Sequence, residues 1–125
     1  AVRNPFDRLV SGWKYLKGTR ERTLLDVLKN PPAKGADYRH LTRPQIAILR
    51  DPHTGTLVCD DLIRFETLQR DFDRVCDRIG KPRVRLSHVN ATARSTGYRE
   101  YFDDETRRLA EIMFADDLAA LGYEF

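Results

Sequence analysis

The chain is poor in cysteine and has no long apolar run. Of its 125 residues only Cys59 and Cys76 are cysteines, which is too few for a disulfide framework or a cysteine-based zinc site. No segment is apolar enough over sufficient length to cross a membrane as a helix. The printed sequence also shows no basic segment followed by an apolar one, the pattern of a signal peptide. Both cysteines lie among apolar residues, which predicts buried free thiols.

The histidines are equally sparse. His40, His53 and His88 are far apart and lack the spacing of zinc ligands, so we expect no metal site. A composition of 41% hydrophobic and 33% charged residues excludes a disordered chain and suits one folded domain over residues 1–125.

Charge is unevenly distributed along the chain. Residues 1–50 carry a net +7 and residues 51–125 a net −4, which together give the overall +3. A basic first half indicates a polyanionic partner or a phosphorylated ligand there, whereas the acidic second half argues against a surface that binds nucleic acid all round.

Apolar spacing predicts more helix than strand. Asn4 and Pro5 form a good helix start, residues 1–3 read as the end of a strand, and Gly80 and Gly122 read as helix ends. We predict helices over residues 6–16, 23–28, 67–79 and 103–121, a helical turn over 44–49, a loop over 33–43 and one or two short strands over 56–65.

The start of the first helix is the first candidate site. A strand that turns into a capped helix at Arg3 places a guanidinium beside free backbone N–H groups, a combination that holds anions. Ser11, about two turns into the helix, could offer a hydroxyl to the same ligand. From spacing alone, the alternative is that Arg3 pairs with a nearby carboxylate and Ser11 is an ordinary helix serine.

Four segments in order resemble one family. Residues 2–13 (Val-Arg-Asn-Pro-Phe-Asp-Arg-Leu-Val-Ser-Gly-Trp) resemble the 3′-phosphate-binding segment of sulfotransferases that use 3′-phosphoadenosine 5′-phosphosulfate (PAPS). Residues 62–72, 88–92 and 101–125 resemble later elements of the carbohydrate-type, Golgi-related branch and its bacterial relatives. The resemblance implies an α/β fold of the P-loop-like sulfotransferase type, with three layers around a central parallel sheet in the complete protein. This chain would be a helix-rich portion of it with few short strands.

The resemblance also implies residue roles. Arg3 and Ser11 would bind the 3′-phosphate of PAPS. Arg94, Ser95 and Tyr98 would lie in a loop that folds over the nucleotide, although the usual Arg-Lys-Gly of that loop is not present and an exposed turn is the alternative. His40 lies in a basic loop resembling the stretch that binds the acceptor, a carbohydrate or other hydroxyl compound.

One family element is not found. The chain has no Gly-rich loop followed by Lys and Ser/Thr, the loop that holds the phosphosulfate group. The resemblance therefore predicts a C-terminal portion whose phosphosulfate loop and catalytic base lie upstream, so the catalytic residues stay unassigned. The composition and the lack of disulfides favour a bacterial cytoplasmic protein; a Golgi lumen location stays open if an anchor precedes the chain.

Two other functions compete with the sulfotransferase. A non-catalytic nucleic-acid module could use the basic first 50 residues, but no known groove-binding or single-strand-binding motif is present. A kinase-like nucleotide enzyme would need a Walker loop. Among other charged residues, we expect Asp116 and Asp117 to lie on a solvated helix face and Glu66 to seat a loop by pairing with an arginine.

Overall fold

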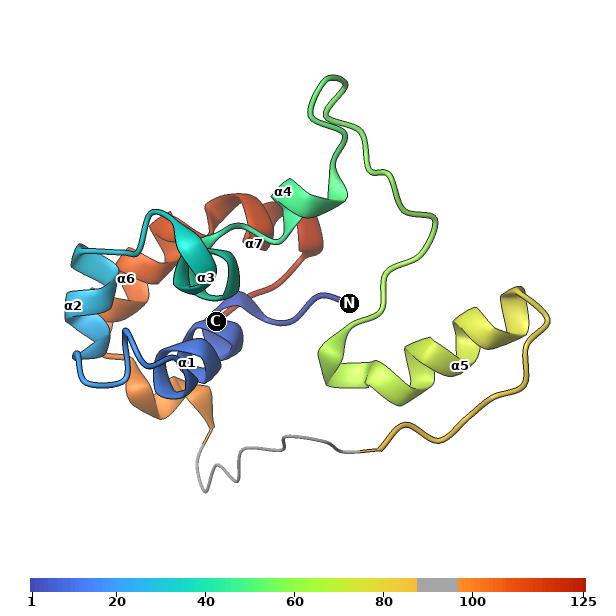
Figure 1. The fold of residues 1–125 in the computed structure, drawn as a ribbon, viewed down its shortest axis with the longest axis horizontal. Helices are drawn as coiled ribbons and strands as arrows, with labels where there is room; N and C mark the ends of the chain where they lie inside the picture. The colour runs from blue at the N-terminus through green and yellow to red at the C-terminus, as the bar shows by residue number, and fades with distance from the viewer. Residues whose placement is uncertain (88–96) are drawn as a thin grey trace.

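A computed structural model describes residues 1–87 and 97–125, and within them every regular element is helical (Figure 1). The α-helices are α1 (Pro5–Tyr15), α2 (Leu24–Lys29), α3 (Gly35–Asp37), α4 (Ile46–Leu49), α5 (Leu68–Arg78), α6 (Asp104–Met113) and α7 (Ala115–Leu121). The remaining helical turns are the π-helix η1 (Tyr38–Thr42) and the 3₁₀-helices η2 (Phe65–Thr67) and η3 (Tyr98–Tyr101).

The predicted α/β architecture with a central parallel sheet is wrong for the described residues, which contain no sheet. They hold two isolated bridges, a parallel one between Val2 and Arg64 and an antiparallel one between Arg50 and Leu57. The parallel bridge does not extend because side chains occupy the backbone groups that neighbouring strands would use. The carboxylate of Asp71 accepts the Arg64 N–H at 2.9 Å, and Gln45 bonds to both backbone groups of Arg3.

Helix α1 begins where the sequence predicts. The Asn4 side chain accepts a hydrogen bond from the Phe6 N–H at 3.0 Å, and Pro5 occupies the first helical position, where no N–H is needed. The buried face of α1 carries Phe6, Leu9 and Val10. This leaves its opposite face available to line a surface site.

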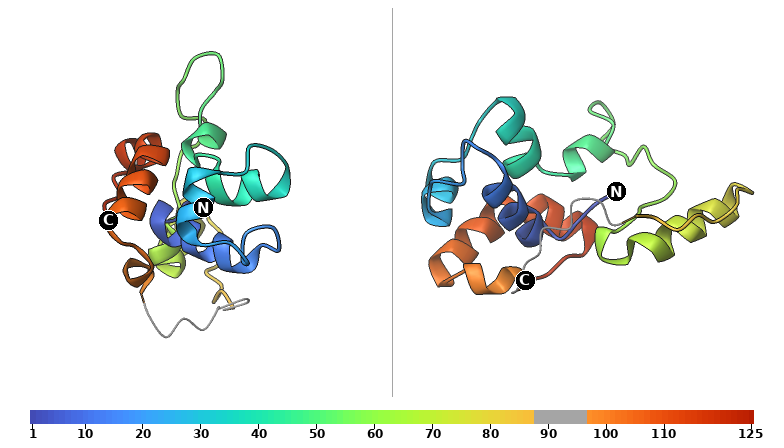
Figure 2. Two further views of the ribbon diagram at one scale, coloured as in Figure 1. Left: turned by 90° about the vertical axis from the view of Figure 1, so that its left-hand side faces the viewer. Right: turned by 60° about the horizontal axis from the view of Figure 1, so that its bottom comes forward.

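The main core lies between α1, α2 and α6, which Figures 1 and 2 show side by side. Phe6 is fully buried at its centre, and its ring meets the rings of Phe102 and Phe125 edge-on at 5.6 and 4.9 Å. The other buried members of this core are Leu9, Leu24, Val27, Leu28, Leu41, Ala110 and Phe114. Residues from both ends of the chain thus share one core.

The C-terminal helical region is two helices, not the single one predicted over residues 103–121. Asp103 is the N-cap of α6, and it forms a reciprocal capping box with Thr106. The helix breaks at Phe114, whose backbone leaves the helical conformation while its ring stays fully buried. Gly122, at φ 65°, ends α7 in the left-handed conformation as predicted.

Helix α5 extends away from the helical body as an arm (Figure 1; Figure 2, right). The buried carboxylate of Asp71 ties its first turn to the preceding chain by accepting from the Arg64 N–H and the Thr67 hydroxyl. Cys76 in this helix is buried and Cys59 is half-buried; both are free thiols. Among the described residues, no helix is long and apolar enough to cross a membrane.

Candidate anion-binding site

An open pocket of about 420 Å³ lies between α1 and the α3–η1 region. Three of the residues singled out from the sequence, Arg3, Ser11 and His40, line it together. The remaining lining residues are Arg8, Gly12, Tyr15, Leu16 and Ala36. On α1 the lining positions 8, 11, 12 and 15 follow helical spacing and form one stripe opposite the buried face. The amphipathic pattern of α1 therefore supplies the core with one face and the pocket with the other.

Arg3 is held on several sides at the start of α1. Its Nε donates to the Asp7 carboxylate at 2.6 Å, and its guanidinium lies 4.3 Å above the centre of the Phe65 ring. The side chain is 21% exposed. Among the residues that the structure describes, its two terminal nitrogens have no hydrogen-bond partner. The pairing with a carboxylate, which was the alternative from the sequence, is thus present. It uses the Nε–H of Arg3, so the N–H groups of the two terminal nitrogens can still donate to a ligand.

Ser11 lies in the middle of α1 and is half-buried. Within the described residues its hydroxyl has no hydrogen-bond partner, so it can donate to a molecule in the pocket. The adjacent Gly12 lets η1 approach closely, because a Cβ there would lie 2.7 Å from Leu41 Cδ1 and 3.7 Å from the His40 carbonyl oxygen. The wall of the pocket is therefore set by direct contact between the two helices.

Arg8 shapes the pocket instead of offering a free cation. Its guanidinium donates to the carbonyl oxygens of Arg43 at 2.8 Å and Arg39 at 3.0 Å, which are the open carbonyls at and after η1. Burial lowers the pKa of Arg8, and the negative charge of Asp117 partly opposes that shift. These bonds hold the turn that carries His40.

His40 stands on η1 at the pocket wall and is exposed. Its exposed imidazole can donate or accept a hydrogen bond, which suits contact with a molecule in the pocket.

The structure separates Tyr98 from this pocket. Its ring stacks on Phe6 at 6.3 Å with an interplanar angle of 9°, and it meets Phe125 edge-on at 5.9 Å. Its hydroxyl accepts a 3.4 Å hydrogen bond from Asn4 Nδ2. Tyr98 thus belongs to the aromatic core under α1. Arg94 and Ser95, the other expected nucleotide contacts, lie outside the described residues.

Three polar residues near the site were missed or misread in the sequence. Gln45 bonds to the backbone of Arg3, and Glu66 accepts from the Asn4 N–H at 2.6 Å and the Tyr123 hydroxyl at 2.9 Å. Burial, followed by the bond to Glu66, raises the pKa of Tyr123 to about 12, so its hydroxyl stays a donor.

Asp117, expected on a solvated face, is fully buried. Its spacing of three from Phe114 and four from Leu121 puts it on the apolar face, which was the available signal.

The described part of the chain contains no group of three or more metal-ligating side chains. Comparison with protein-family models, with curated proteins and with solved structures finds no match to this chain. A function for this chain is therefore inferred from the residues of the pocket itself.

Proposed function

We propose that this pocket binds the 3′-phosphate of PAPS, and that the chain acts in a sulfotransferase that moves the sulfuryl group to a hydroxyl of a carbohydrate. The observation that carries the proposal is the meeting of Arg3 and Ser11 in one open pocket. Both offer donors without protein partners in the described residues, as an anion requires.

The pocket chemistry suits a phosphorylated nucleotide. A guanidinium fork with free terminal nitrogens and a nearby hydroxyl can bind a phosphate through several oxygens. A volume of about 420 Å³ lies in the range of small-molecule sites. The exposed ring of Tyr15 and the side chains of Leu16 and Ala36 add apolar surface beside the charged end.

Each partner has a separate role in the proposed reaction. PAPS supplies the sulfuryl group, which passes to the acceptor oxygen as the sulfur–oxygen bond to the nucleotide breaks and the hydroxyl proton goes to a base. Arg3 and Ser11 hold the nucleotide end of the donor and offset its charge. His40, which also lines the pocket, is the residue of this chain that we assign to the acceptor. The base and the residues that contact the sulfuryl group are left unassigned.

The direct test is a calorimetric titration with the product nucleotide 3′-phosphoadenosine 5′-phosphate (PAP), compared with ATP and with adenosine 5′-phosphate. We expect PAP to bind more tightly than either, because only PAP carries the 3′-phosphate. Equal affinity for the three nucleotides would remove the assignment. Steep salt dependence with nucleic acid and indifference to PAP would instead favour the nucleic-acid module.

Arg3→Ala should weaken PAP binding by about tenfold or more, since a hydrogen bond to a charged group contributes roughly 1.5–3 kcal/mol. Arg83→Ala is the matched control, because Arg83 is an exposed arginine that pairs with Asp77 on the α5 arm. PAP affinity should be unchanged in that variant. A similar loss in both variants would indicate non-specific charge attraction.

A further inference from the structure

Gln45 bonds to the backbone of Arg3 at both of its polar groups. Gln45 Oε1 accepts from the Arg3 N–H at 2.9 Å, and Gln45 Nε2 donates to the Arg3 carbonyl at 2.8 Å. The side chain reaches across 42 positions of sequence to do this and is itself buried, with 9% exposed. Because the amide oxygen and the amide nitrogen bond to the same residue, they hold the backbone of that residue at two points.

Asp117 in turn fixes Gln45. One carboxylate oxygen of Asp117 accepts from the Gln45 N–H at 2.8 Å and from Gln45 Nε2 at 3.4 Å. The other oxygen accepts from the Ile46 N–H at 2.8 Å, so a side chain of α7 caps the start of α4. A fully buried carboxylate is costly unless it is hydrogen-bonded, and these bonds are what it gains. Asp117 of α7 thus holds Gln45 at the start of α4, and Gln45 in turn holds the backbone of Arg3.

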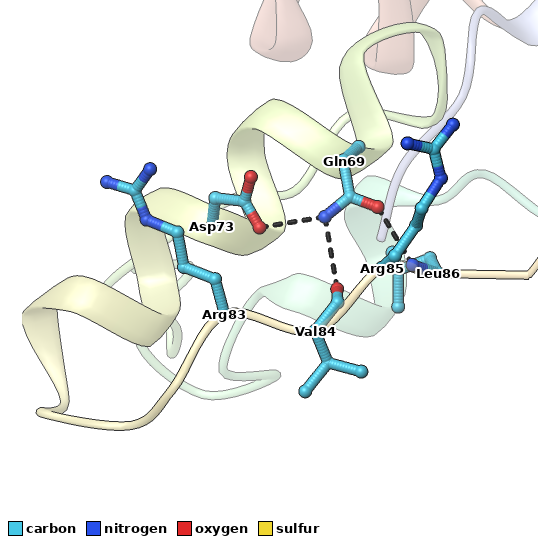
Figure 3. Close-up of a pocket in the computed structure, with 6 residues that line it drawn as sticks. All are labelled: Gln69, Asp73, Arg83, Val84, Arg85 and Leu86. Carbon is cyan, nitrogen blue, oxygen red and sulfur yellow. Dashed lines mark hydrogen bonds between the residues drawn. The ribbon is translucent and has the colours of Figure 1, made fainter.

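The same kind of clamp occurs elsewhere in the molecule, away from the pocket. On the α5 arm, Gln69 Nε2 donates to the Val84 carbonyl at 3.1 Å, and Gln69 Oε1 accepts from the Leu86 N–H at 2.8 Å (Figure 3). That clamp is exposed and ties an extended segment to its own helix. It provides a natural control, because Gln69 also makes a third bond to a carboxylate, from Nε2 to Asp73 at 2.7 Å, so its removal deletes a comparable set of bonds without touching Arg3.

We propose that Gln45, held by Asp117, is a positioning residue that aims the Arg3 guanidinium into the pocket. With the Arg3 backbone fixed, its side chain keeps its Nε on Asp7 and its guanidinium over Phe65. The two terminal nitrogens, which have no partner among the described residues, are then left to bind a ligand. The role of that aim in nucleotide binding rests on the proposed function; the immobilisation of Arg3 does not.

The first test follows Arg3 itself in the full chain, without any ligand. In NMR spectra of the arginine side chains, the Nε–H of Arg3 should exchange slowly with water because it is bonded to Asp7. Gln45→Met keeps the shape of the side chain and removes both bonds to Arg3, together with the 3.4 Å bond to Asp117, so exchange at Arg3 should accelerate by about tenfold. The Nε–H of Arg83, 2.8 Å from Asp77, should be unaffected and serves as the internal standard.

The second test measures nucleotide affinity. Gln45→Met should lower PAP affinity by about tenfold and leave the affinity for adenosine 5′-phosphate unchanged, because only the 3′-phosphate contact depends on Arg3. In an Arg3→Ala background, Gln45→Met should have no further effect on PAP. A purely structural role would weaken both nucleotides and would add to the Arg3→Ala loss.

The outcomes separate the two proposals. Unchanged exchange at Arg3 in folded Gln45→Met, or equal acceleration in Gln69→Met, overturns the positioning role. Failure of the unsubstituted chain to prefer PAP overturns the proposed function, while the exchange result still decides the positioning role. Thermal unfolding of each variant establishes that it is folded. Asp117→Asn weakens the hydrogen bonds that hold Gln45 and keeps the Gln45 amide in place. It should therefore also accelerate exchange at the Arg3 Nε–H. No acceleration in that variant would show that Asp117 does not hold Gln45 in its positioning role.

Discussion

Ser11 is the residue whose contribution to stability and to binding can be separated most cleanly. Its hydroxyl lines the pocket and, among the described residues, makes no hydrogen bond within the protein. Removing it therefore costs the fold almost nothing, whereas a bound phosphate would lose one donor. Arg3 differs, because its guanidinium also pairs with Asp7 and covers Phe65.

Ser11→Ala should reduce PAP affinity by about three- to tenfold, the size of one hydrogen bond to a charged group or slightly less. The midpoint of thermal unfolding should stay the same or rise slightly, because alanine is the better helix former. Calorimetry and thermal unfolding on the same preparation check both statements. A fall in thermal stability with unchanged PAP affinity would show that the hydroxyl serves the fold and not a ligand.

At this scale the sequence predicted residues whose roles are local. The helix start at Asn4 and Pro5 and the helix end at Gly122 depend on neighbouring positions, and both are present. Gln45 and Asp117 were not predicted in their roles, because their bonds join positions 42 and 72 apart in the chain. Nothing in local composition specifies such partners; only the packing of α7 on α4 brings them together.

At the scale of elements, the contact between α1 and η1 determines the width of the pocket. The sequence predicted α1 closely, since its cap, first-turn proline and apolar spacing all agree. It gave residues 33–43 as a loop, although the structure forms α3 and η1 there. The bonds from Arg8 to the carbonyls of Arg39 and Arg43 stabilise that helical turn from outside, so its own sequence carries little signal.

Gly12→Ala should push η1 away from α1. The new Cβ would lie 2.7 Å from Leu41 Cδ1, and Leu41 is fully buried in the core and has little room to move. Overpacking costs about 1–3 kcal/mol, against about 1 kcal/mol gained from helix propensity. We expect a net loss of stability in chemical unfolding and a change in the NMR signals of His40.

Gly97→Ala is the control for this substitution. Gly97 has φ −65°, and a Cβ there would meet no atom of residues 1–87 or 97–125 within 4 Å. Its stability should match that of the original chain. An equally stable Gly12→Ala with unshifted His40 signals would mean that the pocket wall does not depend on the close approach of the two helices.

At the scale of the whole molecule, the helical body and the α5 arm are stabilised differently. The body contains the aromatic and aliphatic core around Phe6 and Phe114. The arm depends on polar contacts of Asp71 and on ion pairs of Asp61 with Arg74 at 2.7 Å and Arg78 at 3.0 Å. The apolar pattern of residues 56–65 predicted strands. In the structure this segment makes only isolated bridges, at Leu57 and Arg64, and the Arg64 N–H bonds to the side chain of Asp71, so no sheet forms among the described residues.

Acid should therefore loosen the arm before the body. Hydrogen bonds from the Arg64 N–H and the Thr67 hydroxyl lower the pKa of Asp71 below its ordinary value of 3.8. A lowered carboxyl pKa means that the stabilisation is fully present above 3.8 and is lost as the pH falls through the lower value. Amide hydrogen exchange, corrected for intrinsic rates, should show α5 losing protection in that range while α1, whose N-cap is the uncharged Asn4, keeps its protection.

Asp71→Asn should produce the loosened arm already at neutral pH and remove the acid-dependent step. Loss of protection in α1 together with α5 would show instead that body and arm unfold as one unit.

The extended segment at residues 1–3 is bonded along both of its edges. Val2 bonds on one side to the Ile63 carbonyl and the Phe65 N–H, and Arg3 bonds on the other to Gln45. An unpaired strand edge invites a second chain to add to it and is a common origin of aggregation. Here a single glutamine amide closes that edge, so the segment beside the pocket offers no template for self-assembly.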